Sequence, residues 1–242
     1  MSARVGLVTG AALRVGKAIA LALAGHGLDV IVHYNRSEAQ ALETVQQIEA
    51  LGVVSAAIQA DLSTPEGVDS LFEQVLGRWG RVDVLVNSPG IMQPGNVLTM
   101  TPADWERTLN TNLRGPFFCS QRAARRMMEQ AEGGCIVNIA DLSGLEPWAT
   151  YPAHSISKAG LIMLTQVMAK ALGPKIRVNA IAPGPVAKPP EWDEARWRKV
   201  GEHTALRRPG NPQNVAQTVI FLLENDYLTG ETIVVDGGGR LY

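Results

Sequence analysis

The stretch "TGAALRVGKAIA", residues 9–20, joins a β-branched run to a helical pattern and decides how the chain is expected to fold. Gly10 permits a tight turn, and Gly16 lets the start of the next helix pack closely on a strand. The free N–H groups and dipole of such a helix N-terminus attract a pyrophosphate. Because the spacing is not G-x-G-x-x-G, a glycine-containing turn without a ligand is the competing interpretation.

On both sides of this turn, short β-branched runs alternate with longer helical patterns. Strands are predicted at 4–10, 29–34, 53–61, 82–88, 134–140, 176–183 and 231–238. Helices are predicted at 16–26, 38–51, 65–79, 102–130, 151–172 and 212–224. Seven strands linked through helices indicate a parallel sheet covered on both faces. The prediction is a doubly wound α/β Rossmann fold, with one domain over residues 1–242.

Composition excludes several classes of protein. The chain has 46% hydrophobic residues, 19% charged residues and a net charge of −1, without the basic excess that nucleic-acid binding requires. Cys119 and Cys135 lack the spacing of a zinc site or a disulfide framework, so no metal is expected. We identify neither a signal peptide nor a membrane-spanning run, and a cytoplasmic location is expected.

The end of the second predicted strand bears on the choice of cofactor. Enzymes that use NAD usually place an acidic residue there, whereas a 2′-phosphate requires cations. The sequence "HYNRSE" instead supplies Arg36 and Ser37, and Arg14 of the glycine turn is expected close by. Each arginine alone could be an ordinary surface charge. Together they favour NADP(H).

The chain resembles a short-chain dehydrogenase/reductase over essentially its whole length. The matching motifs are "TGAALRVG", "ADL" at 60–62, "NSPG" at 87–90, "NLRG" at 112–115, "APG" at 182–184 and "TGETIVVDGG" at 229–238. Within that family, Arg14 and Asp141 resemble the pteridine reductase branch. The resemblance implies cofactor contacts at Thr9, Gly10, Arg14, Val15, Gly16, Tyr34, Asn35, Arg36, Ser37, Asp61, Leu62, Asn87, Ser88, Gly90, Lys158, Pro183 and Gly184.

The expected catalytic residues depart from the family pattern of Asn, Ser, Tyr and Lys. Aligned by motif, these positions hold Asn112, Asp141, His154 and Lys158. The aspartate is shared with pteridine reductases, in which it helps to protonate a pterin nitrogen. Met92 lies near the position where those enzymes tend to carry a stacking phenylalanine, which argues against a pterin as the substrate.

His154 has two interpretations. An imidazole can supply the proton that follows hydride transfer, and Lys158 and Asp141 would shift its titration in opposite directions. Tyr151 offers another hydroxyl near the same helix start. Alternatively, His154 is a helix residue satisfied by backbone, and the protein binds NADPH without turning it over.

Three functions follow from these observations. The first is an NADPH-dependent reductase of a C=N or C=O group in a small, ring-shaped or pterin-like substrate, and the second is an NADP(H)-binding pseudoenzyme or sensor. The third, a lyase-like or dehalogenase-like derivative, is disfavoured because Arg36 and the glycine turn suit a dinucleotide. A hydrolytic triad using Ser143 or Ser155 is rejected because no G-x-S-x-G elbow exists.

Two further expectations concern the surroundings of the site. The irregular segment around 185–210 should cover the substrate, and Trp148 and Trp192 flank the expected pocket. The apolar faces of helices 102–130 and 151–172 exceed what one side of a sheet needs. In the resembling family these helices pair between subunits, so a homotetramer is expected, without nucleic-acid or membrane partners.

Overall fold

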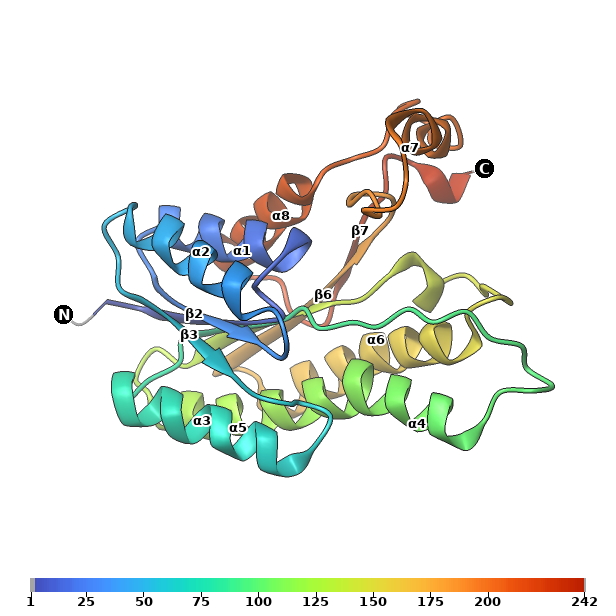
Figure 1. Ribbon diagram of the computed structural model, residues 1–242. Helices are drawn as coiled ribbons and strands as arrows, with labels where there is room; N and C mark the ends of the chain where they lie inside the picture. Colours follow the sequence, from blue (N-terminus) through green and yellow to red (C-terminus); the bar gives the residue numbers. More distant parts are fainter. Residues whose placement is uncertain (1–2, 242) are drawn as a thin grey trace.

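The computed structural model describes residues 3–241; residues 1, 2 and 242 of the expected domain lie outside this range. One parallel sheet of seven strands runs through the molecule in the order β3-β2-β1-β4-β5-β6-β7 (Figure 1). The strands are β1 (Val5–Thr9), β2 (Asp29–Tyr34), β3 (Ser55–Gln59), β4 (Val84–Asn87), β5 (Gly134–Ile139), β6 (Ile176–Pro183) and β7 (Thr232–Val235). The predicted doubly wound fold is confirmed.

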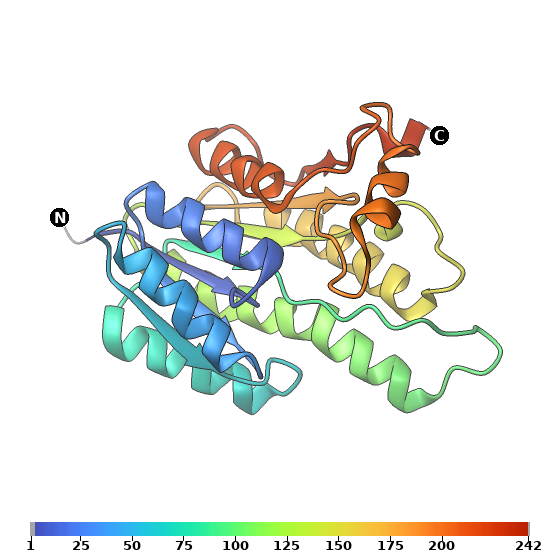
Figure 2. The same cartoon turned by 45° about the horizontal axis from the view of Figure 1, so that its top comes forward.

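The central strands read as continuous apolar runs because helices bury both of their faces. The first helical layer contains α1 (Arg14–Gly25), α2 (Glu38–Glu49) and α8 (Pro212–Glu224). The opposite layer contains α3 (Pro65–Trp79), α4 (Pro102–Leu109), α5 (Gly115–Glu129) and α6 (Pro152–Leu172) (Figures 1 and 2). None of the helices within residues 3–241 is long and apolar enough to cross a membrane.

The helix predicted over 102–130 is interrupted by a π-helical turn, η1 (Asn110–Arg114), between α4 and α5. Pro116 explains the break, because a proline has no N–H and its ring crowds the carbonyl group four residues earlier, here that of Asn112. A wider turn relieves this clash, and such turns are frequent at functional sites. Asn112 lies at the centre of the turn.

The segment after β6 is more regular than the sequence suggested. Residues Glu194–Gly201 form α7, whose N-cap Asp193 accepts a hydrogen bond from the N–H of Arg196 at 2.7 Å. Arg198 and Lys199 in the last turn complement the helix dipole. Both ribbon views place α7 beyond the carboxyl ends of β6 and β7, outside the two helical layers (Figures 1 and 2).

The strand order reverses between β1 and β4, which are direct neighbours although two strands separate them in sequence. In open parallel sheets the loops leaving such a pair diverge to opposite faces and open a crevice. The glycine turn follows β1 and the "NSPG" motif includes the end of β4, so the fold brings both motifs to this crevice.

Candidate active site

A cleft of about 1180 Å³ opens at the reversal point and contains most of the expected site residues. It is lined from the glycine turn, from the ends of β2, β4, β5 and β6, from the start of α6 and from the segment around α7. The expected residues that line it are Gly10, Arg14, Val15, Gly16, Tyr34, Asn35, Arg36, Ser37, Asp61, Ser88, Gly90, Asp141, Tyr151, His154, Lys158, Pro183 and Gly184.

The remaining expected residues, Thr9, Leu62, Asn87 and Asn112, are buried outside this lining. The Thr9 hydroxyl donates to the carbonyl of Val86 and accepts from the N–H of Ser88, which ties β1 to the loop after β4. Leu62 packs in the core. Asn87 donates from Nδ2 to the side chains of two neighbours, Ser120 and Asn138. Family motifs therefore marked residues that shape the cleft along with residues that face it.

The glycine turn combines left-handed backbone with a close approach of two segments. Gly10 has φ of +67°, and a Cβ on Gly16 would collide with the carbonyl of Gly10. Arg14 also adopts a left-handed conformation, with φ of 54°, which is uncommon for a residue with a side chain. Its guanidinium donates to the carbonyl of Ala187 at 2.7 Å and so ties the turn to the segment after β6.

His33 supports the same turn and was missed in the sequence. Its Nδ1 accepts from the N–H of Gly10 at 3.1 Å, so Nε2 carries the proton and donates to the carbonyl of Ala60 at 3.1 Å. Burial lowers the pKa of His33 to about 4, which keeps the ring neutral. The available signal was a lone polar residue at the carboxyl end of the apolar run "VIVH".

Cationic side chains face the end of the cleft beyond β2. Arg36 and Ser37 line it here, and Arg14 lines the same cleft from the glycine turn, with its guanidinium bonded to the Ala187 carbonyl. The first acidic residue after β2, Glu38, begins α2 and accepts a hydrogen bond from the hydroxyl of Tyr34 at 3.3 Å. The loop therefore offers the positive charge of Arg36 and the hydroxyl of Ser37 at the end of β2.

Lys158 places an ammonium group at the inner wall of the cleft. Its Nζ donates to the carbonyl of Ile139 at 2.8 Å, and a Cβ on Gly90 would lie 3.6 Å from Nζ. Burial lowers the pKa of Lys158 to about 8, and the charge of Asp141 acts in the opposite direction. An ammonium group has three donors, so two stay available to a ligand.

His154 and Asp141 face each other beside Lys158. His154 is 4% exposed, and its Nε2 is buried without a hydrogen-bond partner. The distance from Nε2 to Oδ1 of Asp141 is 3.8 Å, too long for a hydrogen bond but within ion-pair range for a protonated ring. Burial opposes ionisation of Asp141, but His154 and the N–H of Ser143 outweigh it and hold the pKa of the carboxyl below its usual range.

Aromatic side chains enclose the outer part of the same region. Trp148 and Tyr151 pack edge to face with their ring centroids 6.3 Å apart, and both line the cleft. Trp192 and Trp197 line it from the segment after β6, and the guanidinium of Arg196 stacks 4.0 Å from the Trp192 ring. As expected, Trp148 and Trp192 lie on the pocket wall.

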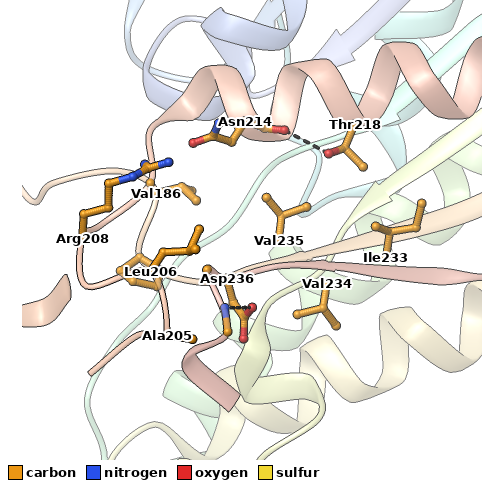
Figure 3. Close-up of a pocket in the computed structure, with 14 residues that line it drawn as sticks. Val186, Ala205, Leu206, Arg208, Asn214, Thr218, Ile233, Val234, Val235 and Asp236 are labelled. Atoms are coloured by element: carbon orange, nitrogen blue, oxygen red, sulfur yellow. Dashed lines mark hydrogen bonds between the residues drawn. The ribbon is translucent and has the colours of Figure 1, made fainter. Parts of the chain in front are cut away.

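A second hollow, of about 650 Å³, lies between β7 and the start of α8 (Figure 3). Three of its polar side chains already serve the fold. Asn214 completes the capping box of α8, and Thr218 donates to the Asn214 carbonyl at 2.9 Å. Asp236 accepts from the N–H groups of Gly238 and Arg240. The first cleft is therefore the candidate active site.

Comparisons with known proteins agree with this geometry. A family model described as enoyl-(acyl carrier protein) reductase matches residues 10–239. The 3-oxoacyl-(acyl-carrier-protein) reductase of Synechocystis sp. is 37% identical, covering 98% of this chain and 97% of that protein. The chain belongs to the short-chain dehydrogenase/reductase family. The resemblance drawn from its motifs is thereby confirmed at the level of the family.

Other relatives are named for reactions on different substrates. The 2-dehydro-3-deoxy-D-gluconate 5-dehydrogenase of Escherichia coli is 32% identical over 98% of this chain and 96% of its own length. The crystal structure of an acetoin dehydrogenase from Salmonella typhimurium superposes with a TM-score of 0.92 at 35% identity, covering 99% of this chain and 97% of that one. The shared property of these relatives is oxidoreductase chemistry.

Proposed function

We propose that this short-chain dehydrogenase/reductase is an NADPH-dependent reductase of a C=N or C=O group in a small substrate, with His154 as the proton donor. The observation that carries the proposal is the unpartnered Nε2 of His154, buried at the cleft wall and 3.8 Å from a carboxylate. A buried polar atom without a partner costs stability unless a ligand completes it. A substrate heteroatom would do so.

The residues present fit a phosphorylated dinucleotide. The left-handed turn at Gly10 leads into α1, which begins at Arg14, and the N–H groups of the first turn of this helix would bind the pyrophosphate. Arg36, Ser37 and Arg14 would hold the 2′-phosphate, and Lys158 would hold ribose hydroxyls with its two remaining donors. The nicotinamide supplies a hydride to the substrate carbon when it is bound.

The side chains of this protein would manage the accompanying proton. A protonated His154 would carry an N–H at Nε2, on the wall of the cleft and 3.8 Å from Oδ1 of Asp141. The negative charge that develops on the substrate heteroatom would draw this proton away. Lys158 stabilises the same charge from its place one turn later on α6.

The wall of the cleft favours a flat, cyclic substrate. Trp148, Tyr151 and Trp192 present ring surfaces, and Asp141 offers a carboxylate to an N–H donor or a cationic nitrogen. These features, with Arg14, support a place in the pteridine reductase-like branch and make pterins the first compounds to assay. Met92 lines the cleft without an aromatic ring, so other conjugated cyclic imines belong in the same panel.

The test is NADPH oxidation, followed by absorbance, across a panel of pterins, cyclic imines and ketones. The expected result is turnover that His154→Phe lowers by about 10²–10⁴ and Tyr151→Phe retains. Turnover lost only in Tyr151→Phe would transfer the donor role to that hydroxyl. A wild-type protein that binds NADPH but reduces no compound, while His154→Tyr becomes active, would identify an NADP(H)-binding pseudoenzyme.

We also propose a homotetramer. Apolar side chains remain exposed along α5 and α6, where helices of two subunits would pair: Phe117 at 38%, Ile156 at 50%, Met163 at 57% and Val167 at 56%. A contiguous exposed apolar face usually marks an interface. Light scattering gives the oligomer mass, and Met163→Glu with Val167→Glu should reduce it.

A further inference from the structure

We propose that Asn112 is a positioning residue that selects the tautomer of His154 through the carbonyl group of Ile91. This inference rests on the proposed role of His154 as the proton donor. The side-chain amide of Asn112, in the π-helical turn, would have this role without contacting the cofactor or the substrate. The result is that the proton of His154 leaves and returns at Nε2, on the side of the cleft.

The side chain of Asn112 clamps the backbone of Ile91 on both polar groups. Its Oδ1 accepts from the N–H of Ile91 at 2.9 Å, and its Nδ2 donates to the carbonyl of Ile91 at 2.9 Å. The π-helical turn around Pro116 puts Asn112 in this place, and the side chain is fully buried. The Ile91 carbonyl is therefore held in a fixed direction.

The two amide hydrogens of Asn112 decide which ring nitrogen of neutral His154 carries the proton. An amide nitrogen has two hydrogens, and those of Asn112 are used by the Ile91 carbonyl and by Oγ of Ser157 at 3.1 Å. Ser157 accepts this bond because its own proton goes to the carbonyl of His154 at 2.7 Å. The Asn112 amide therefore has no hydrogen left for Nδ1 of His154, 3.3 Å away.

Nδ1 of His154 must then carry its own proton, because its other neighbour is the Ile91 carbonyl at 3.0 Å and a carbonyl only accepts. The neutral ring is left with a lone pair on Nε2. His33, the other buried histidine, has the opposite arrangement, since the N–H of Gly10 donates to its Nδ1. The two buried rings thus hold opposite tautomers.

This arrangement suits a donor at Nε2. When a protonated His154 gives up its Nε2 proton, the ring that remains is the Nδ1–H tautomer, which the Ile91 carbonyl already stabilises. The Nδ1 side is closed by Asn112, Ser157 and Ile91, so the ring regains its proton from the cleft, beside Asp141. Weakening the clamp should therefore slow proton donation without changing the binding of NADPH.

The experiment is nitrogen NMR of the histidine rings in full-length protein labelled with ¹⁵N-histidine, above the pH at which the rings are charged. We expect one buried ring with Nδ1–H, assigned to His154 by its loss in His154→Phe, and one with Nε2–H, from His33. In Ser157→Ala, the freed amide hydrogen of Asn112 can turn to Nδ1, and the Nε2–H fraction of His154 should rise. Asn112→Ala should also change the Nε2–H fraction of His154, whereas Asn110→Ala, in the same turn, should leave that fraction unchanged.

Kinetics supply the second readout. Ser157→Ala should lower kcat about fivefold, the equivalent of one neutral hydrogen bond, and leave the Kd of NADPH unchanged. A wild-type His154 protonated at Nε2 would overturn the proposal, as would an unchanged tautomer in both Asn112→Ala and Ser157→Ala. Because the NMR result needs no substrate, it stands or falls separately from the proposed reductase activity.

Discussion

If Arg36 holds the 2′-phosphate as proposed, replacing it with alanine should remove the expected preference for NADPH over NADH. Arg36 is exposed at the end of β2, on the cleft wall, and among residues 3–241 it forms no ion pair that cofactor binding would have to break. A charge-assisted hydrogen bond is worth ~1.5–3 kcal/mol, or roughly 10- to 150-fold in affinity. Exposure to water favours the lower limit, so the Kd of NADPH should rise about tenfold.

The assay is fluorescence titration of NADPH and NADH against wild type, Arg36→Ala and Arg78→Ala. Arg78 stacks on Trp79 at the end of α3, away from the cleft, so its variant controls for the lost charge alone. The Kd of NADH should stay nearly the same in all three proteins. Equal Kd values of the two cofactors in wild type, or an equal loss of both in Arg36→Ala, would refute the reasoning.

Further predictions concern the buried groups around the cofactor. Lys158→Met should weaken NADPH binding and lower kcat together, and unaltered affinity by titration would contradict the placement of Lys158. Hydrogen bonds from Lys158 to the ribose oxygens favour its charged form, so its pKa of about 8 should rise when NADPH binds. Binding should therefore take up protons at roughly pH 9 and few at pH 7, as measured by calorimetry in two buffers. His33 has its pKa lowered from 6.5 to about 4 in the folded protein, so it binds protons more readily in the unfolded state. The free energy of unfolding should therefore fall by about 3 kcal/mol as the pH drops from 6.5 to about 4. Urea titration at each pH measures this change. Gly16→Ala should abolish NADPH binding while the far-ultraviolet circular dichroism is retained, because the added Cβ displaces the Gly10 carbonyl; normal binding would contradict the role of the turn.

The order of strands and helices could be predicted because it rests on local patterns. Continuous apolar runs such as "VGLVT" and "VLVN" mark strands buried on both faces, and Thr64 before Pro65 is a standard helix start. The motifs also placed the cleft, because strand ends in a doubly wound sheet converge at one edge. The π-helical turn was missed, since it depends on how Pro116 meets the carbonyl of Asn112.

The details of the site could not be predicted because they depend on contacts between distant residues. His33 meets Gly10 across 23 positions, and His154 meets the Ile91 carbonyl across 63. The sequence left open whether backbone satisfies the nitrogens of His154. In the structure, Nδ1 is hydrogen-bonded to the backbone carbonyl of Ile91, whereas Nε2 has no hydrogen-bond partner. Likewise, the family motifs did not show that four of their residues are buried outside the cleft lining, namely Thr9, Leu62, Asn87 and Asn112.

The most direct test of the central claim is the pH dependence of kcat for NADPH oxidation in wild type, His154→Phe and His154→Tyr. A positioned acid contributes about 10²–10⁴ in rate, so His154→Phe should lose that factor with the Kd of NADPH nearly unchanged. His154→Tyr should recover part of the rate and move the alkaline limb to higher pH, because a phenol holds its proton to higher pH than an imidazole. Full activity and an unchanged pH profile in His154→Phe would contradict the assignment of His154 as the proton donor.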